Sequence, residues 1–131
     1  MMIRRQVKTS SREELVDITG VVREVLQESS GPEISAVMVF IPHTTAGVTI
    51  NENADPDVRT DIITGLRRMV PFEQGFRHAE GNSDAHIKAS LLGSSVMVPV
   101  ENGRLVLGTW QGIYLAEFDG PRTRTLMIKT L

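Results

Sequence analysis

The sequence predicts an α+β fold in which mostly antiparallel sheet combines with about three helices. Helical periodicity is confined to the first 92 residues, whereas short apolar segments separated by turn signals fill the rest of the chain. The 131 residues suffice for one hydrophobic core and are too few for two ordinary domains. We therefore expect a single domain that spans residues 1–131.

The first part of the chain alternates strands with a helix. Its apolar patterns predict strands at 2–8 and 15–18 and a helix at about 19–29. Residues 34–41 form a continuous apolar run, which is typical of a strand buried on both faces, and we place this strand at the centre of the sheet. A further strand is predicted at 46–50.

The clearest helix is predicted at 56–69. Asp55 is a candidate N-cap, Pro56 suits the first helical position, and apolar residues recur on one face. A shorter helix is expected at about 84–92. The stretch 72–82 between these helices has no regular period and is longer than most connections, which is typical of a functional loop.

The last third of the chain is predicted to form a meander of antiparallel strands. Asn102-Gly103 is a strong two-residue hairpin signal, because both residue types tolerate a positive φ. Asp119-Gly120-Pro121 is the second turn signal. The strands that these turns separate are predicted at 96–100, 104–109, 113–118 and 122–129.

Composition excludes several classes of protein. A formal net charge of -2 argues against a basic surface for nucleic acid. No apolar run approaches the roughly 20 residues that span a bilayer, and the first residues lack the apolar segment of a secretory signal. We therefore expect a cytoplasmic protein without nucleic-acid or membrane partners. Because cysteine is absent, any metal site must use His, Asp, Glu or Asn.

The chain has three histidines, His43, His78 and His86, each predicted at the end of an element or in the irregular loop. Neutral imidazole is the commonest metal ligand in proteins, and histidine as a residue type exchanges protons near neutral pH. No HxH or HExxH pattern is present, so each histidine taken alone is better explained as a structural or surface residue. A shared site is the alternative.

Other polar side chains are candidates for chemistry. Glu117 shares a strand face with apolar residues, so its carboxylate is expected to meet a cation, a histidine or a cavity edge, or to form a salt bridge with an arginine on a neighbouring strand. Arg122 and Arg124 either clamp a phosphate group or serve as edge charges that suppress aggregation. Thr44 and Thr45 lie in a turn whose hydroxyls and amides can hold an anion.

Three long stretches of the sequence carry most of these candidates. They are HTTAGVTINENADP at 43–56, HAEGNSDAHIK at 78–88, and GTWQGI at 108–113 with DGPR at 119–122. Together they resemble the YjbQ family, whose members are often labelled secondary thiamine-phosphate synthases. The matches occur in order and at compatible spacing over nearly the whole chain. This resemblance is therefore far more specific than any short pattern above.

The resemblance implies an α+β fold that assembles as a homotrimer, a divalent metal such as zinc or magnesium, and the joining of a pyrimidine diphosphate to a thiazole phosphate. The histidines of the family's motifs, the expected metal ligands, fall on His43, His78 and His86. We predict catalytic roles for Glu52, Glu80, Asp84 and Glu117. Binding of a phosphate-bearing small molecule is predicted for Thr44, Thr45, Asn51, Asn82, Arg122 and Arg124.

Three functions are consistent with such a site. The first is a transferase in which diphosphate leaves a pyrimidine methylene carbon and a thiazole nitrogen attacks that carbon. The second is metal-assisted hydrolysis of a small phosphate or other ester, in which three histidines leave a coordination position for water. The third is a non-enzymatic trimer that binds a small anion or a protein partner.

Overall fold

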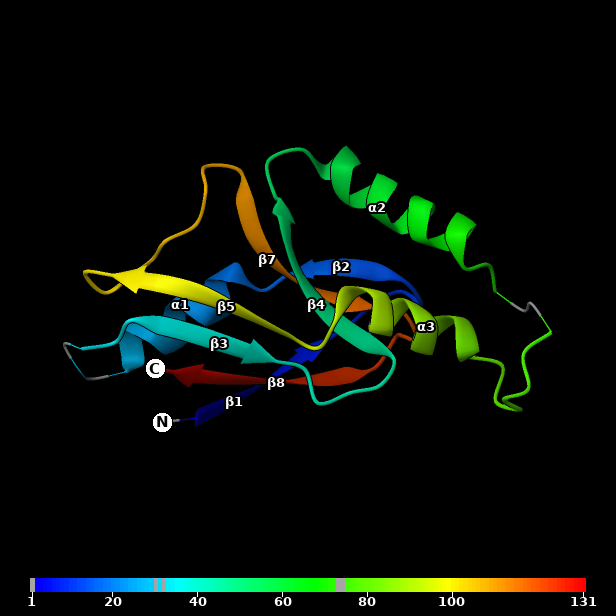
Figure 1. Ribbon diagram of the computed structural model, residues 1–131, viewed down its shortest axis with the longest axis horizontal. Coiled ribbons are helices and arrows are strands. Elements are labelled where there is room, and N and C mark those ends of the chain that lie inside the picture. Colours follow the sequence, from blue (N-terminus) through cyan, green and yellow to red (C-terminus); the bar gives the residue numbers. More distant parts are fainter. Residues whose placement is uncertain (1, 30, 32, 73–74) are drawn as a thin grey trace.

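Eight strands in two antiparallel sheets and three helices make up the part of the chain that the computed structural model describes, residues 2–29, 31, 33–72 and 75–131 (Figure 1). In chain order they are β1 (Met2–Lys8), β2 (Glu14–Asp17), α1 (Thr19–Glu28), β3 (Ala36–Phe40), β4 (Ala46–Glu52), α2 (Pro56–Met69), α3 (Ser83–Leu92), β5 (Ser95–Glu101), β6 (Arg104–Leu105), β7 (Gln111–Glu117) and β8 (Thr123–Thr130). The sheet orders are β1-β8-β3-β5-β6 and β2-β7-β4. The predicted α+β class is confirmed.

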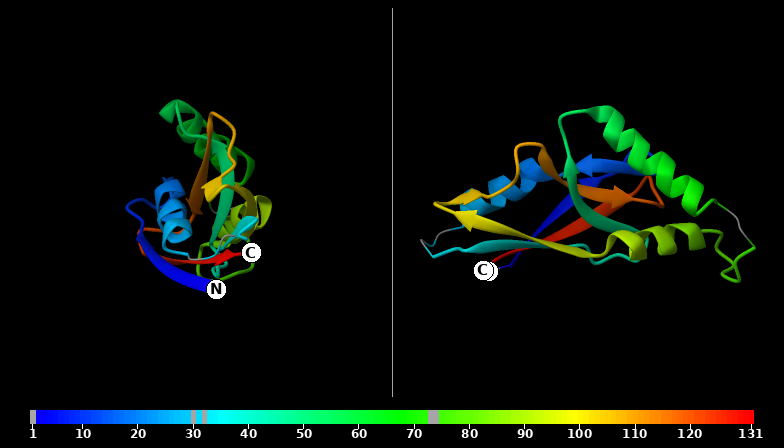
Figure 2. Two further views of the ribbon diagram at one scale, coloured as in Figure 1. Left: turned by 90° about the vertical axis from the view of Figure 1, so that its left-hand side faces the viewer. Right: turned by 45° about the horizontal axis from the view of Figure 1, so that its top comes forward.

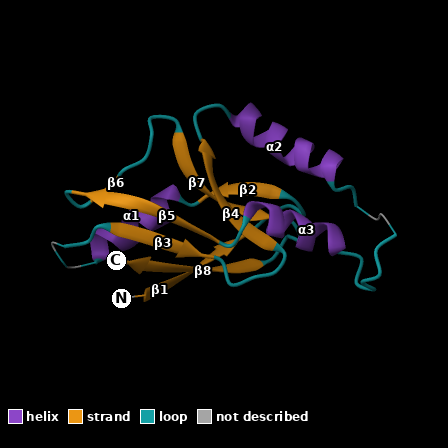
Figure 3. Ribbon diagram, in the orientation of Figure 1, coloured by secondary structure: helices purple, strands orange, loops and turns teal. Residues whose placement is uncertain are grey.

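The main hydrophobic core joins both sheets and α1. Its buried side chains are Ile18, Val22, Val25, Leu26, Val37, Val39, Ile41, Ala46, Val48, Val98, Val100, Ile113, Leu115, Leu126 and Ile128. A second cluster combines residues of β2 and β7 with residues of α2 and α3, which lie beside the three-stranded sheet (Figure 3). The three-stranded sheet therefore contributes buried residues to both clusters.

The strand buried on both faces is β7, not the predicted 34–41. In β7, Ile113 and Leu115 belong to the main core, while Tyr114 and Ala116 belong to the second cluster. The predicted central position of β3 is confirmed, because it is the third of five strands in its sheet. Its burial on both faces is wrong: alternate residues are buried and Phe40 is exposed, since only one face of this sheet meets the core.

The predicted strands 113–118 and 122–129 are confirmed as β7 and β8, but the predicted meander pairing is correct only at its first turn. Asn102 and Gly103 have φ values of 52° and 74° and join β5 to β6, as the hairpin signal indicates. β6 has two residues instead of the predicted 104–109, and β7 then pairs with β2 and β4 in the other sheet. β8 pairs with β1 and β3. The position of β7 differs from the meander because both of its faces are apolar. A strand between the two core clusters can bury both faces.

Helix α2 has the predicted bounds, and the Asp55 carboxylate accepts a hydrogen bond from the Asp57 amide at 2.9 Å, as an N-cap should. Its buried side centres on Ile63 and Leu66, whereas Met69 is exposed. None of the described helices is long and apolar enough to span a membrane. The predicted irregular stretch 72–82 includes residues 73 and 74, which lie outside the described residues.

The end of β3, the start of β4, the end of β7 and the start of β8 converge near α3 (Figures 1 and 2). Gly47 allows α3 to approach β4 closely, because a Cβ atom there would lie 2.6 Å from the Gly93 carbonyl oxygen. Helix α3 ends at Leu92, near the predicted end, and Gly93 follows it with a φ of 92°. The convergence places loop and helix side chains opposite the ends of four strands.

Candidate functional site

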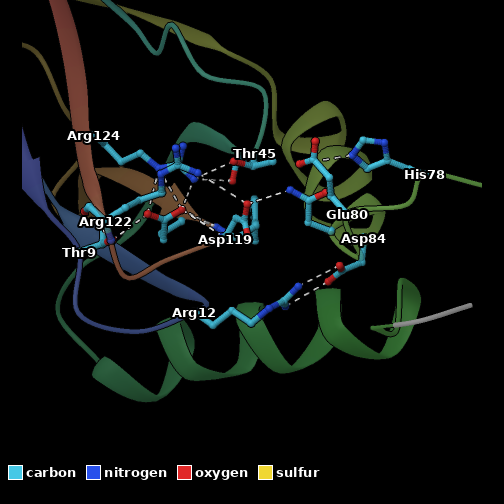
Figure 4. A network of polar contacts seen from close by, with 12 residues as sticks. Thr9, Arg12, Thr45, His78, Glu80, Asp84, Asp119, Arg122 and Arg124 are labelled. Carbon is cyan, nitrogen blue, oxygen red and sulfur yellow. Dashed lines mark hydrogen bonds and ion pairs between the residues drawn. The ribbon is translucent and has the colours of Figure 1, made fainter. Parts of the chain in front are cut away.

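A cavity of about 680 Å³ lies at this convergence. All three histidines border it: His43, His78 and His86. The other predicted site residues on its lining are Thr44, Thr45, Glu80, Asn82, Arg122 and Arg124. Figure 4 shows the arginines on one side and His78 with Glu80 on the other. Residues that lie as far apart in the sequence as His43 and Arg124 therefore border one cavity. This arrangement supports a shared site over three separate histidines.

Asn51 and Glu52 lie outside this cavity. They are at the far end of β4, whose first residue, Ala46, lines a neighbouring cavity together with His43 and His86. The Asn51 side-chain oxygen accepts from the Glu52 amide at 2.7 Å, and the Glu52 carbonyl accepts from the Tyr114 hydroxyl at 3.0 Å. Both residues therefore have local structural contacts instead of a place in the cavity, and the predicted grouping does not extend to them.

A buried ion pair joins Glu117 to Arg124, one of the two arginines that border the cavity. Both side chains are about 1% exposed or less. Arg124 Nε donates to the two carboxylate oxygens at 2.9 and 3.0 Å, and Nη2 donates to the same carboxylate and to the Thr45 hydroxyl. This is the salt bridge with an arginine that was one alternative for Glu117. Because β8 lies between β1 and β3, Arg124 is not an edge charge.

The Glu117 carboxylate is fully occupied. It also accepts from the Thr9 hydroxyl at 2.7 Å and from the amides of Phe118 and Asp119 at 3.1 Å. Burial by itself raises the pKa of Glu117, but the hydrogen bonds from Arg124 and Thr9 outweigh it and hold the pKa below its ordinary value. Glu117 therefore holds Arg124 in place, and its position does not support the predicted catalytic role.

The two arginines offer donors to the cavity in different ways. Among the described residues, Nη1 of Arg124 has no hydrogen-bond partner, although Nε and Nη2 are fixed by Glu117 and Thr45. The Arg122 side chain is 50% exposed and lies 3.7 Å from the Asp119 carboxylate. One cation is therefore rigid and the other adjustable. We call Arg122 and Arg124 the cationic side of the cavity.

His43 is held by a backbone amide. Its Nε2 accepts a hydrogen bond from the Thr125 N–H at 2.9 Å. Burial lowers the pKa of His43, and the nearby charges of Arg124 and Arg122 lower it further, whereas Glu117 opposes the shift. The ring is therefore neutral at pH 7, with its proton on Nδ1.

His78 and His86 form a pair on the opposite side. Their rings meet edge to face with centroids 5.5 Å apart. His78 Nε2 is 3.7 Å from a carboxylate oxygen of Glu80. Imidazole and carboxylate groups at this spacing are suited to binding or moving a proton. We call His78 and His86 the imidazole side of the cavity.

Asp84 belongs to a cluster of buried ion pairs, and with His78 it lines a second, smaller cavity. Its carboxylate is 1% exposed and accepts two hydrogen bonds from Arg12, at 3.0 and 3.2 Å. Lys88, which is fully buried, donates to Asp84 at 3.0 Å and to Glu13 at 2.6 Å. Asp84 does not line the main cavity. These charges fix α3, and with it His86, against the loop between β1 and β2.

Asp119 is a site residue that the sequence-based prediction missed. Its carboxylate accepts from the Asn82 side-chain nitrogen at 2.9 Å, which connects the start of α3 to the turn before β8. The Asn82 Oδ1 atom is buried and has no partner among the described residues. Asn82 itself lines the cavity. The Asp119-Gly120-Pro121-Arg122 motif was the signal available for Asp119.

The donor set does not fit a metal ion shared by the three histidines. In the described part of the chain, no group of three or more histidine, aspartate or glutamate side chains is arranged to hold a metal. The Nε2 lone pair of His43 is already used by the Thr125 amide. A tetrahedral site built on His43, His78 and His86 would need a different arrangement of these rings. The zinc or magnesium ion that the resemblance implies stays a prediction.

Acid is expected to destabilise the protein through three buried carboxylates, Glu13, Asp84 and Glu117. Their pKa values in the folded protein lie below the ordinary values of 4.5, 3.8 and 4.5. Burial raises each of them, but hydrogen bonds from buried or paired cations lower them more. As the pH falls, the unfolded chain therefore binds protons at a higher pH than the folded protein does. The contribution of these carboxylates to the free energy of unfolding is present above pH 4.5 and is lost as the pH falls through their pKa values in the folded protein. Urea denaturation from pH 7 to pH 3 measures the loss, and an unchanged free energy of unfolding would contradict it.

Comparison with known proteins identifies the relatives of this chain. A family model described as UPF0047 protein YjbQ-like matches residues 3–131. The UPF0047 protein YugU of Bacillus subtilis is 55% identical over 127 residues, which cover 96% of each chain. A UPF0047 protein of Methanocaldococcus jannaschii is 52% identical over 131 residues, which cover 100% of this chain and 94% of the relative.

Solved structures agree with these sequence matches. The crystal structure of a YjbQ/UPF0047 family protein from Clostridium acetobutylicum superposes with a TM-score of 0.95 at 52% identity and covers 98% of this chain and 99% of its own. A protein of Aeropyrum pernix gives a TM-score of 0.94 at 38% identity, covering 100% of this chain and 98% of its own. The resemblance inferred from the three sequence motifs is confirmed.

Proposed function

Since the chain belongs to the YjbQ-like UPF0047 family, we propose that it is a thiamine-phosphate-synthase-like transferase that joins a pyrimidine diphosphate to a thiazole phosphate. The observation that supports this proposal best is one cavity with two arginines on one side and a histidine pair on the other. Its volume of about 680 Å³ is that of a small-molecule site. The specific reaction comes from the family resemblance.

The cationic side suits the leaving group. In the proposed reaction the bond between the pyrimidine methylene carbon and the diphosphate oxygen breaks, and the electron pair leaves with the diphosphate. The thiazole nitrogen then donates its lone pair to the methylene carbon. Negative charge grows on the departing oxygen, and the charges of Arg122 and Arg124 stabilise it. No protein nucleophile is needed, so the absence of cysteine is compatible with this chemistry.

The imidazole side supplies proton exchange. His86, on the first turns of α3, faces His78 across an edge-to-face contact. A histidine at this place can protonate the diphosphate after its bond to carbon has broken.

Hydrolysis of a small phosphate ester is the second candidate. The specific observation in its favour is the same histidine pair with Glu80 3.7 Å from His78, which is suited to activating a water molecule. A non-enzymatic trimer that binds an anion is the third candidate, because the cationic side alone suffices for binding. The homotrimer, the divalent metal and the cytoplasmic location stay predictions.

We expect the purified protein to form thiamine monophosphate and free diphosphate from the two substrates. Replacing Arg122 by glutamine should lower kcat/KM by about 100-fold or more, because one donor to the developing charge is lost. Replacing His86 by alanine should lower kcat by a similar factor. Product formation is measured by chromatography of the reaction mixture, with the metal content of the protein determined beforehand.

Arg104→Gln is the matched control, because Arg104 is exposed on β6 and lies outside the cavity. Its activity should equal that of the unmodified protein. Phosphate release from simple phosphate esters without thiamine monophosphate formation would favour the hydrolase. Thermal stabilisation by diphosphate without any turnover would favour the binding protein. Full activity of His86→Ala would contradict the assignment of the site.

A further inference from the structure

The side chain of His43 has one fixed nitrogen and one free nitrogen. Thr125 N–H on β8 points at Nε2 from 2.9 Å. A backbone N–H is always a donor, so Nε2 must be the acceptor, and an imidazole with a proton on Nε2 would place two hydrogens against each other. The hydrogen bond therefore selects the tautomer that carries its proton on Nδ1.

The proton on Nδ1 has no acceptor among the described residues. His43 borders the cavity together with Arg122 and Arg124. Two carboxylates lie beside these groups. Glu117 is already saturated by Arg124, Thr9 and two backbone amides, and Asp119 pairs with Arg122 and accepts from Asn82. The His43 Nδ1–H and Nη1 of Arg124 thus border the cavity without a protein acceptor among the described residues, whereas Arg122 also lies 3.7 Å from the Asp119 carboxylate.

We propose that His43 is a fixed, neutral hydrogen-bond donor that binds an oxygen of a phosphate or diphosphate group through Nδ1–H, and that it is not a metal ligand. This inference rests on the proposed function, because it names the anionic group that the cationic side receives. It departs from the metal role that the family resemblance implies for His43. The low pKa of His43 agrees with a ring that stays neutral beside two arginines.

Phosphate is the group that this arrangement fits. A guanidinium nitrogen of Arg124, the adjustable guanidinium of Arg122 and the His43 N–H come from three different places on the lining. A phosphate group presents several oxygens in tetrahedral directions, whereas a carboxylate presents two in one plane. The adjacent Thr44 offers a fourth, hydroxyl donor. Neutral His43 adds a donor without adding a third positive charge.

Two substitutions separate the roles of the two nitrogens. In His43→Asn the side-chain amide nitrogen occupies the place of Nδ1, so the donor is kept and the acceptor for Thr125 is lost. In His43→Gln the amide group occupies the place of Nε2, so the acceptor is kept and the donor is lost. Inorganic diphosphate is the probe, and calorimetry on the full chain at pH 7 and fixed ionic strength measures its binding.

We expect His43→Gln to weaken diphosphate binding by about 10-fold or more, the effect of one hydrogen bond to a charged group, and His43→Asn to weaken it by about 3-fold or less. The reverse order would overturn the proposal, as would failure of the unmodified protein to bind diphosphate. Circular dichroism checks that both variants fold. Diphosphate binding with the expected order but without thiamine monophosphate formation would remove the proposed transferase and leave this inference intact.

Nuclear magnetic resonance of the unmodified protein gives a test that needs no variant. In ¹⁵N-labelled protein at pH 7, the His43 ring should show an unprotonated Nε2 and a protonated Nδ1. Addition of Zn²⁺ alone should leave both His43 signals unchanged, whereas diphosphate should shift Nδ1. A proton on Nε2, or a selective response of His43 to Zn²⁺, would overturn the proposal and favour the metal role.

Discussion

Replacing Glu117 by glutamine should lower the free energy of unfolding by about 3–5 kcal/mol, because it leaves the buried charge of Arg124 without its partner. The carboxylate and the guanidinium are almost inaccessible to water, at 0% and 1% exposure. Solvent cannot replace the lost charge. The same substitution disturbs the hydrogen bonds that Thr9 and the amides of Phe118 and Asp119 donate.

Glu28→Gln is the matched control. Glu28 pairs with Arg5, but both side chains are well exposed, at 55% and 34%, so the loss should be at most about 1 kcal/mol. Urea denaturation followed by far-ultraviolet circular dichroism measures both variants. Tryptophan fluorescence is a poor probe here, because Trp110 is 63% exposed in the folded protein and its surroundings change little on unfolding. Equal losses in the two variants would show that burial of the Glu117 pair has no energetic consequence.

A double variant separates stability from binding. Glu117→Leu combined with Arg124→Met removes both buried charges, and apolar replacement of such a pair often restores stability. The double variant should therefore be more stable than Glu117→Gln. Its diphosphate binding should nevertheless be weak, because Nη1 of Arg124 is lost from the cationic side. Strong binding by a well-folded double variant would show that Arg122 alone provides this side.

Local signals explain why some elements could be predicted from the sequence. Asp55 and Pro56 define the start of α2 through contacts with their immediate neighbours, and Asn102-Gly103 defines the β5–β6 hairpin through the backbone angles that these residues tolerate. The partners of β7 and β8 depend instead on strands whose paired residues lie up to 127 positions away in the chain, as for Met2 and Lys129. No local pattern specifies such pairings, which is why the meander prediction failed.

The same distinction applies to the candidate site. The histidines could be grouped because long motifs surround them, and a cation beside Glu117 could be expected because an isolated carboxylate on an apolar strand face is costly to bury. Glu52 belongs to the same motif as His43, yet β4 rises roughly 3.3 Å per residue and takes Glu52 about 20 Å from the strand's first residue. Sequence proximity within an extended strand therefore does not imply a shared site.

The ion pairs that hold α3 could not be predicted from the sequence either. Arg12 and Asp84 are 72 residues apart, and Glu13 and Lys88 are 75 apart, so neither pair has a spacing signature. Nothing in the local sequence distinguishes Arg12 and Glu13 from the charges of a solvated loop. Only the packing of that loop against α3 makes them partners of buried residues, and it is this packing that sets the position of His86.

Replacing Lys88 by methionine tests that role of the loop. The ammonium group of Lys88 is fully buried between Glu13 and Asp84, which are 5% and 1% exposed. Methionine fills similar space without the charge, so two nearly inaccessible carboxylates lose a cation. We expect a loss of about 3 kcal/mol at pH 7. Lys129→Met, on an exposed position of β8, is the control and should change the free energy of unfolding by less than about 0.5 kcal/mol.

The pH dependence of this loss identifies its cause. Burial raises the pKa values of Glu13 and Asp84, but hydrogen bonds that include those from Lys88 lower them below 4.5 and 3.8. Removing Lys88 should therefore raise both pKa values toward those of the unfolded chain. The stability that the lysine adds is present above pH 4.5 and disappears as the carboxylates bind protons. The difference between Lys88→Met and the unmodified protein should thus be large at pH 7 and small near pH 3. An equal difference at both pH values would mean that the lysine stabilises α3 by packing and not by charge.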